Sequence, residues 1–275
     1  MTGERAGQLD EVARALRAPF VPRVFERLAA CDGYLDAVWP QIAPAVQTAG
    51  FLGSALYLAD MALDAVTETY EPVLSRASLT ALGVLDAADA DVLLDVLDAF
   101  HWVQPQALLI AAALAEAFEA PRVGGEGRSE SRMTSERERR HLAVLVRLAP
   151  SEQPPLPAIA STLQLDEAPT LYRAVAMWPG ALNAAWAELQ HLSAYPPLRR
   201  RARALYYYAR SAARFLAVPI EADAAALHAR GVGDEAIARA RVAVDAALPE
   251  LATMVVHCCA LRAALGVTTR EVVRD

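Results

Sequence analysis

Lysine is absent from this sequence, and arginine supplies all 26 of its basic residues. We attribute this to the codon usage of a GC-rich genome; the functional alternative is selection for arginine's bidentate binding of phosphate or carboxylate. Acidic residues outnumber basic ones, and the formal net charge is -7. Nucleic acid is therefore not expected as the main partner, because its binding depends on neutralising phosphates. The basic cluster at residues 199–203 follows two prolines and is interpreted as the exposed start of a helix.

Cysteine is also scarce. Cys31, Cys258 and Cys259 form no CxxC pair, and this pattern is typical of reduced thiols in a cytoplasmic protein. Residues 1–17 carry acids and no continuous apolar stretch, so a secretory signal is not expected. We therefore predict a cytoplasmic location.

Uninterrupted apolar runs of membrane-spanning length are missing as well. The two most apolar runs are residues 107–118 and 251–267. The first is too short to cross a bilayer, and the second contains His257 and Arg262. Both are predicted to be buried helices, and no membrane partner is expected.

Residues that favour strands are few, since isoleucine is rare and aromatic residues make up 7% of the chain. Alanine and leucine, which favour helices, dominate. Apolar residues recur at helical spacing, as at Leu9, Val12 and Leu16, and no convincing alternating pattern is present. The sequence therefore predicts an all-α fold. Prolines are expected to mark the helix starts and ends; they are Pro19, Pro40, Pro44, Pro105, Pro121, Pro169, Pro179, Pro196 and Pro249.

Two related halves are predicted on either side of a linker. Residues 121–140 are rich in glycine, serine and charge, which is typical of a linker; residues 141–148 are predicted helical, and SEQPPLP follows. The proposed division is helical repeat 1 over 1–120, linker over 121–157 and helical repeat 2 over 158–275.

The evidence for a repeat is a short match, CDGYLDAVW in the first half and WPGALNAAW in the second, in which a glycine, a leucine, an alanine and the final tryptophan align. Each half also ends in an apolar helix that follows a proline, Pro105 or Pro249. A duplicated helical unit would form an intramolecular pseudo-dimer, with a ligand pocket between its repeats.

Common catalytic signatures are missing: the sequence has no GxGxxG, P-loop, GxSxG or HExxH motif. The histidines at 101, 141, 191, 228 and 257 do not stand at metal-ligand spacing on one helix. No cofactor and no metal are expected.

Four segments carry a resemblance to a known family: Leu16–Trp39, Asp98–Gly125, Ala168–Pro179 and Val255–Gly266. In their order and spacing they resemble the group I 2-haloacid dehalogenases. The resemblance implies an all-α pseudo-dimer with a pocket between its repeats. It also implies cofactor-free hydrolysis, in which a carboxylate activates a water that displaces halide from C2 of a short 2-halo acid with inversion. In that family an asparagine helps to hold the water.

The resemblance places the expected catalytic aspartate at Leu171, which cannot accept a proton. Thr170 stands where the family has a serine next to that aspartate. Gln104 stands where the family has its asparagine, and it keeps the amide group. Ala107 stands where the family has a tyrosine. The pocket aromatics of the first repeat fall at Phe20, which stays aromatic, and at Arg23, which does not; Trp102 and Tyr172 are further candidates for the lining.

Three residues are candidates for a relocated base: Asp166, Glu167 and His101. The alternative interpretation, which we prefer, is that the first two cap the next helix and that His101 caps a helix end. Arg23 is a candidate anchor for a substrate carboxylate, and the alternative is a surface or ion-paired arginine. Gln104, His101 and Glu167 are thus the predicted catalytic residues.

Three functions follow from these residues. The first is a dehalogenase-like enzyme that acts on a small or medium carboxylic acid with altered chemistry, namely cyclisation, elimination or isomerisation, because Leu171 cannot activate water. The second is a hydrolytic dehalogenase with a relocated base. The third is a non-catalytic protein that binds a small molecule. A homodimer is compatible with all three.

Overall fold

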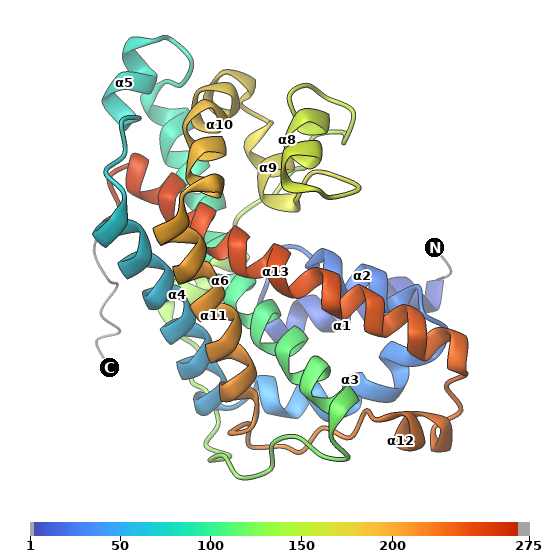
Figure 1. The fold of residues 1–275 in the computed structure, drawn as a ribbon. Helices are drawn as coiled ribbons and strands as arrows, with labels where there is room; N and C mark the ends of the chain where they lie inside the picture. Colours follow the sequence, from blue (N-terminus) through green and yellow to red (C-terminus); the bar gives the residue numbers. More distant parts are fainter. Residues whose placement is uncertain (1–2, 269–275) are drawn as a thin grey trace.

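A computed structural model describes residues 3–268 of the chain, and this range contains thirteen α-helices and no β-strand. The helices of the first half are α1 (Gly3–Leu16), α2 (Arg23–Ala29), α3 (Tyr34–Val46), α4 (Ala49–Thr69), α5 (Arg76–Ala81) and α6 (Ala87–Glu119). Those that follow are α7 (Glu136–Leu142), α8 (Leu156–Leu163), α9 (Thr170–Val175), α10 (Pro179–Ala194), α11 (Pro196–Ala213), α12 (Ala224–Ala229) and α13 (Asp234–Ala264). The predicted all-α class is confirmed (Figure 1).

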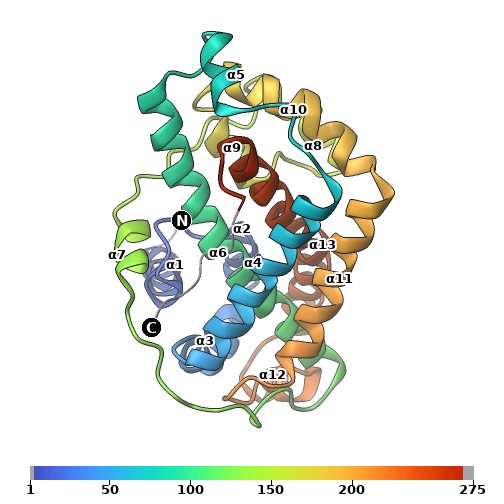
Figure 2. The ribbon, with the colours of Figure 1, turned by 90° about the vertical axis from the view of Figure 1, so that its left-hand side faces the viewer.

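Four long helices, α4, α6, α11 and α13, form the centre of the molecule, and each of them contacts the other three (Figures 1 and 2). The helices α1 to α3 pack beside this centre, and α10 packs against α11 and α13. The apolar spacing that predicts α1 is confirmed, because Leu9, Val12 and Leu16 are all buried. Helical periodicity therefore becomes a continuous core once the long helices are brought together.

The two longest helices, α6 and α13, are joined inside the core by an ion pair. Arg262 donates from Nε to Oδ1 of Asp98 at 2.6 Å, and the Arg262 side chain is 1% exposed. This contact explains an arginine within an apolar run. By length and hydropathy alone α4 and α13 could each cross a membrane; 44% and 56% of their most apolar stretches are buried inside the protein.

Several prolines lie inside helices, where the sequence predicted boundaries. Pro40 and Pro44 lie within α3, Pro105 within α6 and Pro249 within α13. The boundary prediction is wrong at these positions, because burial along a long helix outweighs the loss of one N–H and the strain at the preceding turn. The helix predicted over 141–148 is also wrong in its extent, since α7 ends at Leu142.

The two halves run through similar elements in the same order. With α7 counted as part of the linker, each half has two helices of at most fourteen residues, then two further helices, a six-residue helix and finally a helix of more than thirty residues. The halves also exchange contacts, since α2 packs against α13 and α9 packs against α6. This order is the one that the predicted duplication requires, and the duplication itself stays a prediction.

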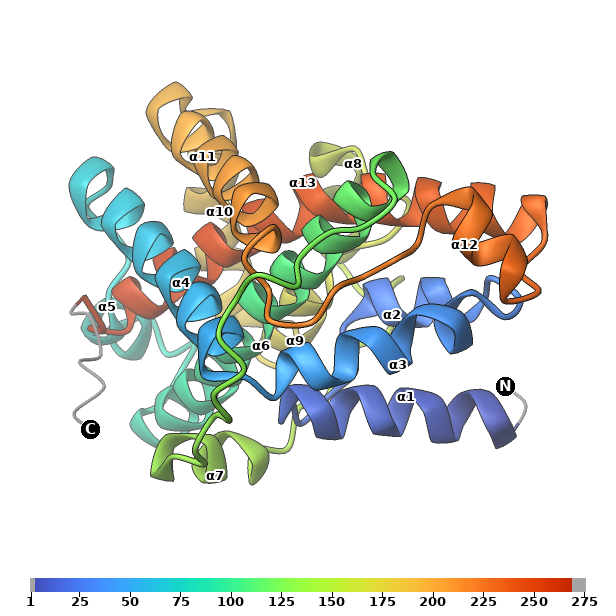
Figure 3. The ribbon, with the colours of Figure 1, turned by 90° about the horizontal axis from the view of Figure 1, so that it is seen from below.

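The segment between the halves is anchored to the core, although its composition is that of a linker. It crosses the underside of the molecule from α6 to α7 (Figure 3). Val123 and Ile220 exchange backbone hydrogen bonds, and Ala49 donates its N–H to the carbonyl of Glu130. At Gly127 an added Cβ would lie 2.1 Å from the carbonyl oxygen of Phe215, so this crossing requires a glycine.

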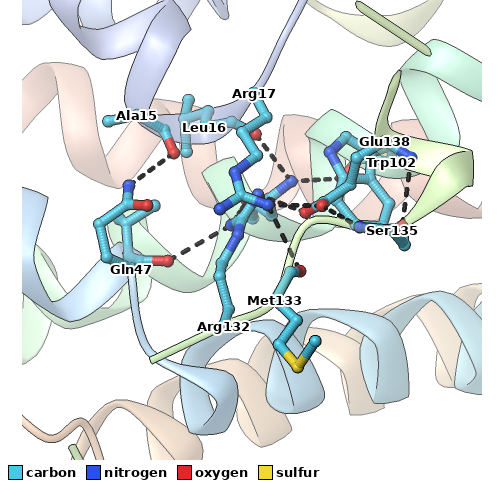
Figure 4. Close-up of polar contacts among 11 residues, drawn as sticks. Ala15, Leu16, Arg17, Gln47, Trp102, Arg132, Met133, Ser135 and Glu138 are labelled. Carbon is cyan, nitrogen blue, oxygen red and sulfur yellow. Dashed lines mark hydrogen bonds and ion pairs between the residues drawn. The ribbon is translucent and has the colours of Figure 1, made fainter. Parts of the chain in front are cut away.

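A buried charge cluster holds the end of this segment (Figure 4). Arg132 pairs with Glu138 at 2.8 Å, and their side chains are 1% and 0% exposed. The second oxygen of Glu138 accepts from Arg17 at 2.5 Å, and Gln106 of α6 accepts from Arg132 at 3.2 Å. Burial lowers the pKa of Arg132 to about 10, which still leaves it charged at neutral pH. The cluster therefore ties the end of α1, the core helix α6 and α7 together.

Replacing Glu138 by alanine is expected to destabilise the protein by about 3–5 kcal/mol, because it leaves the buried Arg132 charge without its partner. Denaturant unfolding at pH 7 measures the change. Glu136→Ala is the matched control on the same helix: its ion pair with Arg139 is exposed, so at most about 1 kcal/mol should be lost. Equal losses in the two variants would contradict a structural role for the cluster.

Candidate functional site

A small cavity, mostly apolar but with several polar side chains, lies where α2 and the start of α9 meet the two longest helices, α6 and α13. Four of the predicted site residues line it: Phe20, Arg23, Gln104 and Thr170. Its volume is about 30 Å³. A water molecule needs roughly 10–15 Å³ of such space, so the cavity has room for a water but not for a substrate without side-chain movement.

Two proline-containing turns bring the lining residues together. Pro22 is extended, with φ -63° and ψ 135°, and α2 begins directly after it at Arg23. Pro169 is also extended and precedes Thr170 in the same way at the start of α9. Because the fixed φ of proline suits the residue before a helix, both turns set the direction in which these first helical side chains leave the backbone. Phe20 packs against Phe100 of α6, with ring centroids 4.4 Å apart, and closes one wall.

Two buried polar atoms of the lining have no hydrogen-bond partner among the described residues. They are Nη1 of Arg23, a donor, and Oε1 of Gln104, an acceptor. The other arm of Arg23 is engaged, since its Nη2 lies 3.1 Å from a carboxylate oxygen of Glu167. Each unsatisfied buried group costs about 1–3 kcal/mol, so these two atoms mark a place that favours a polar ligand or water.

A carboxylate that the sequence analysis did not single out also lines the cavity. Glu250 of α13 is 10% exposed, and Nη1 of Arg27 lies 3.5 Å from its Oε2. Burial raises the pKa of Glu250, while the charges of Arg27 and Arg23 act against the rise. The sequence carries one signal that could have identified Glu250. Glu250 directly follows the proline of α13, Pro249, and Gln104 directly precedes the proline of α6.

The remaining predicted site residues do not line this cavity. His101 lies near Cys259, with 3.6 Å between Nδ1 and the sulfur, and Trp102 packs against Arg132 and His141. Ala107 and Leu171 are fully buried in the core. Glu167 is about half exposed beside Arg23, and Asp166 is exposed.

Tyr172 lies outside the cavity lining and is hydrogen-bonded to a histidine of α13. Its hydroxyl is hydrogen-bonded to Nδ1 of His257 at 2.7 Å, and its ring packs edge-on against Trp186. Burial lowers the pKa of His257 to about 4 and raises that of Tyr172 well above its usual range. Both are therefore neutral at pH 7 and serve as a buried polar contact between α9 and α13.

His257 should make stability depend on pH. Its folded-state pKa is below the unfolded value, so its contribution is complete above about pH 6.5 and is lost as pH falls toward 4, amounting to about 3 kcal/mol. Unfolding free energies measured between pH 7 and pH 4 test this. In His257→Gln, which replaces the imidazole near Tyr172 by a polar amide that cannot titrate, that part of the pH dependence should disappear. Parallel pH curves for the two proteins would contradict the assignment.

A larger groove of about 750 Å³ opens on the other side of α13, between α8, α10 and α11. It is lined by exposed side chains such as Arg199, Arg203 and Tyr207, with His257 at its floor. None of the buried unsatisfied polar atoms belongs to a residue that lines it. Among the described residues, moreover, no group of three or more histidine, cysteine, aspartate or glutamate side chains is placed to hold a metal ion. The small cavity is therefore the better candidate site.

Comparison with known proteins gives a family and a fold. The model of a family described as halocarboxylic acid dehydrogenase DehI matches residues 19–163, just over half of the chain. No curated protein sequence matches this chain.

Similar solved structures cover nearly the whole chain. A D-2-haloacid dehalogenase mutant in complex with D-2-CPA has a TM-score of 0.83 at 17% identity, covering 96% of this chain and 92% of the other. A second mutant structure has a TM-score of 0.84 at 15% identity, with the same coverage. A complex of D-2-haloacid dehalogenase with L-LA has a TM-score of 0.82 at 17% identity, covering 96% and 93%. At these identities the likeness shows the fold.

Proposed function

The chain belongs to the halocarboxylic acid dehydrogenase DehI family, and on this basis we propose that it binds a small carboxylic acid in the cavity between α2, α6, α9 and α13 and acts at C2 of that acid. The observation that carries the proposal is the pair of buried, unsatisfied atoms, Nη1 of Arg23 and Oε1 of Gln104, which belong to two residues that line one cavity. A carboxylate accepts from the first, and a water or hydroxyl donates to the second.

The walls of the cavity suit a short acid. Phe20, Phe100, Leu251 and Met254 supply apolar surface, and Arg23 supplies the charge. The space of about 30 Å³ must enlarge for an acid to enter. Glu167 is the side chain best placed to move, because it is about half exposed and pairs with Arg23. An incoming carboxylate would replace Glu167 as the partner of Arg23. The similar structures were solved with D-2-CPA and L-LA, which supports ligands of this size class.

The reaction depends on which group accepts a proton. Leu171 stands where the resemblance places the catalytic aspartate, and it is buried in the core. That observation favours altered chemistry at C2, such as cyclisation, elimination or isomerisation, in which no water is activated. The polar side chains among the lining residues, such as Gln104 and Glu250, and the room for a water favour hydrolysis with a relocated base instead, and we adopt hydrolysis as the proposed reaction. Of the three bases that the sequence offered, His101 and Asp166 do not line the cavity and Glu167 is held by Arg23 at its edge.

Arg23→Gln is expected to weaken the binding of propionate, the parent acid without a leaving group, by about 10- to 100-fold, because one charge-assisted hydrogen bond is lost. Calorimetric titration or ligand-induced thermal stabilisation measures the affinity. The control is Arg76→Gln, which removes an arginine that pairs with Asp91 on the surface and does not line the cavity. Unchanged affinity in Arg23→Gln would mean that the acid binds elsewhere.

Halide release from D- and L-2-chloro and 2-bromo acids tests the reaction, and we expect the native protein to release halide and form a 2-hydroxy acid, identified by NMR. An unsaturated or cyclic product would indicate the altered chemistry instead. If the native protein releases no halide but Leu171→Asp does, the native substrate is not a haloacid. Propionate binding without turnover in either protein would identify a non-catalytic binder.

A further inference from the structure

One acidic side chain lines the candidate cavity, and it is Glu250 of α13. We propose that Glu250 is the general base of this site. It takes the role of the aspartate that the resemblance places at position 171, where this chain has Leu171. This inference rests on the proposed function, because it requires the acid to bind in the same cavity. It differs from every base that the sequence suggested, since Asp166, Glu167 and His101 lie outside the lining.

The geometry of the lining can hold and orient one water. A space of about 30 Å³ has room for a water, and a buried water needs two to four polar partners. Oε1 of Gln104 has no donor among the described residues, so it can accept one hydrogen of that water. Glu250 is the charged acceptor in the lining, in addition to the hydroxyl of Thr170, and no described residue donates a hydrogen bond to its Oε1. A water bound by both directs its lone pair away from them, toward an acid held by Arg23.

The proposed step transfers one proton and displaces one halide. The water donates a proton to Glu250 as its oxygen forms a bond to C2 of the acid. The carbon–halogen bond breaks, and the halide leaves with the bonding pair. The product is a 2-hydroxy acid, and the proton on Glu250 returns to solvent before the next turnover. No oxidant, reductant or other co-reactant is required.

The charges around Glu250 suit a base. The charged groups that face it come from α2, namely Arg27 and Arg23, whereas Gln104 from α6 and Thr170 from α9 are uncharged. Arg27 lies 3.5 Å away, close enough to keep the carboxylate in place but at the limit of a hydrogen bond. Burial raises the pKa of Glu250, which brings it closer to the neutral range in which a general base is most effective.

Glu250→Gln is the first test, with Glu26→Gln as its control. Glu26 is another carboxylate whose pKa burial raises and which interacts with Arg23, but it is more exposed and does not line the cavity. The rate of 2-hydroxy acid formation should fall by about a hundredfold to ten-thousandfold in Glu250→Gln and stay near the native rate in Glu26→Gln. In the native protein the rate should rise with pH through the pKa of Glu250 and then level, and Glu250→Gln should lose this dependence. A native rate in Glu250→Gln overturns the inference.

The pH dependence of propionate binding is a second readout that needs no turnover. A bound carboxylate repels an ionised Glu250, so native affinity should fall by about tenfold as pH rises through the pKa of this residue, the change that one pKa unit of coupling produces. Over the pH range in which propionate itself stays ionised, Glu250→Gln should bind propionate with an affinity that does not change with pH. Binding that is independent of pH in the native protein overturns the role of Glu250 and leaves the proposed function standing. No binding of propionate at any pH overturns the proposed function itself.

Discussion

The packing of α6 against α13 is the contact on which the rest of this structure depends. These helices exceed thirty residues, lie in the centre of the molecule and are joined by an ion pair between the buried Arg262 and the part-buried Asp98. Each contains a proline, and a polar residue of the candidate site stands beside each proline, Gln104 before Pro105 and Glu250 after Pro249. The interface that stabilises the fold thus also brings the two side chains to one cavity.

Burial gives the cavity its chemical character. A surface arginine and glutamine would be satisfied by water, but here Nη1 of Arg23 and Oε1 of Gln104 are enclosed without a partner among the described residues. The same enclosure raises the pKa of Glu250. Because an unpaired polar atom costs more free energy in a low-dielectric interior, the fold keeps these groups at some cost to stability, which is typical of functional sites.

The segment between the halves has the composition of an exposed linker, but the structure anchors it through buried charges. Its glycines, serines and charges predicted a linker, yet Arg132 and Glu138 are more deeply buried than many apolar residues of the protein. A sequence window cannot distinguish a solvated charge from one that finds its partner inside the protein, since the partners Arg17 and Gln106 lie far away in the chain. The cluster fastens the end of α1, which precedes α2, to α6 and α7.

Local pattern determined the all-α class, the buried face of helices such as α1, and the choice of Phe20, Arg23, Gln104 and Thr170, which share one cavity. These follow from periodicity and from a resemblance that runs along the chain. Only the tertiary structure decided that prolines stand inside the long helices, that His101 and Trp102 face away from the cavity, and that Glu250 faces into it. The physical reason is that a helix offers several faces, and the face that meets the site is set by packing between segments distant in sequence.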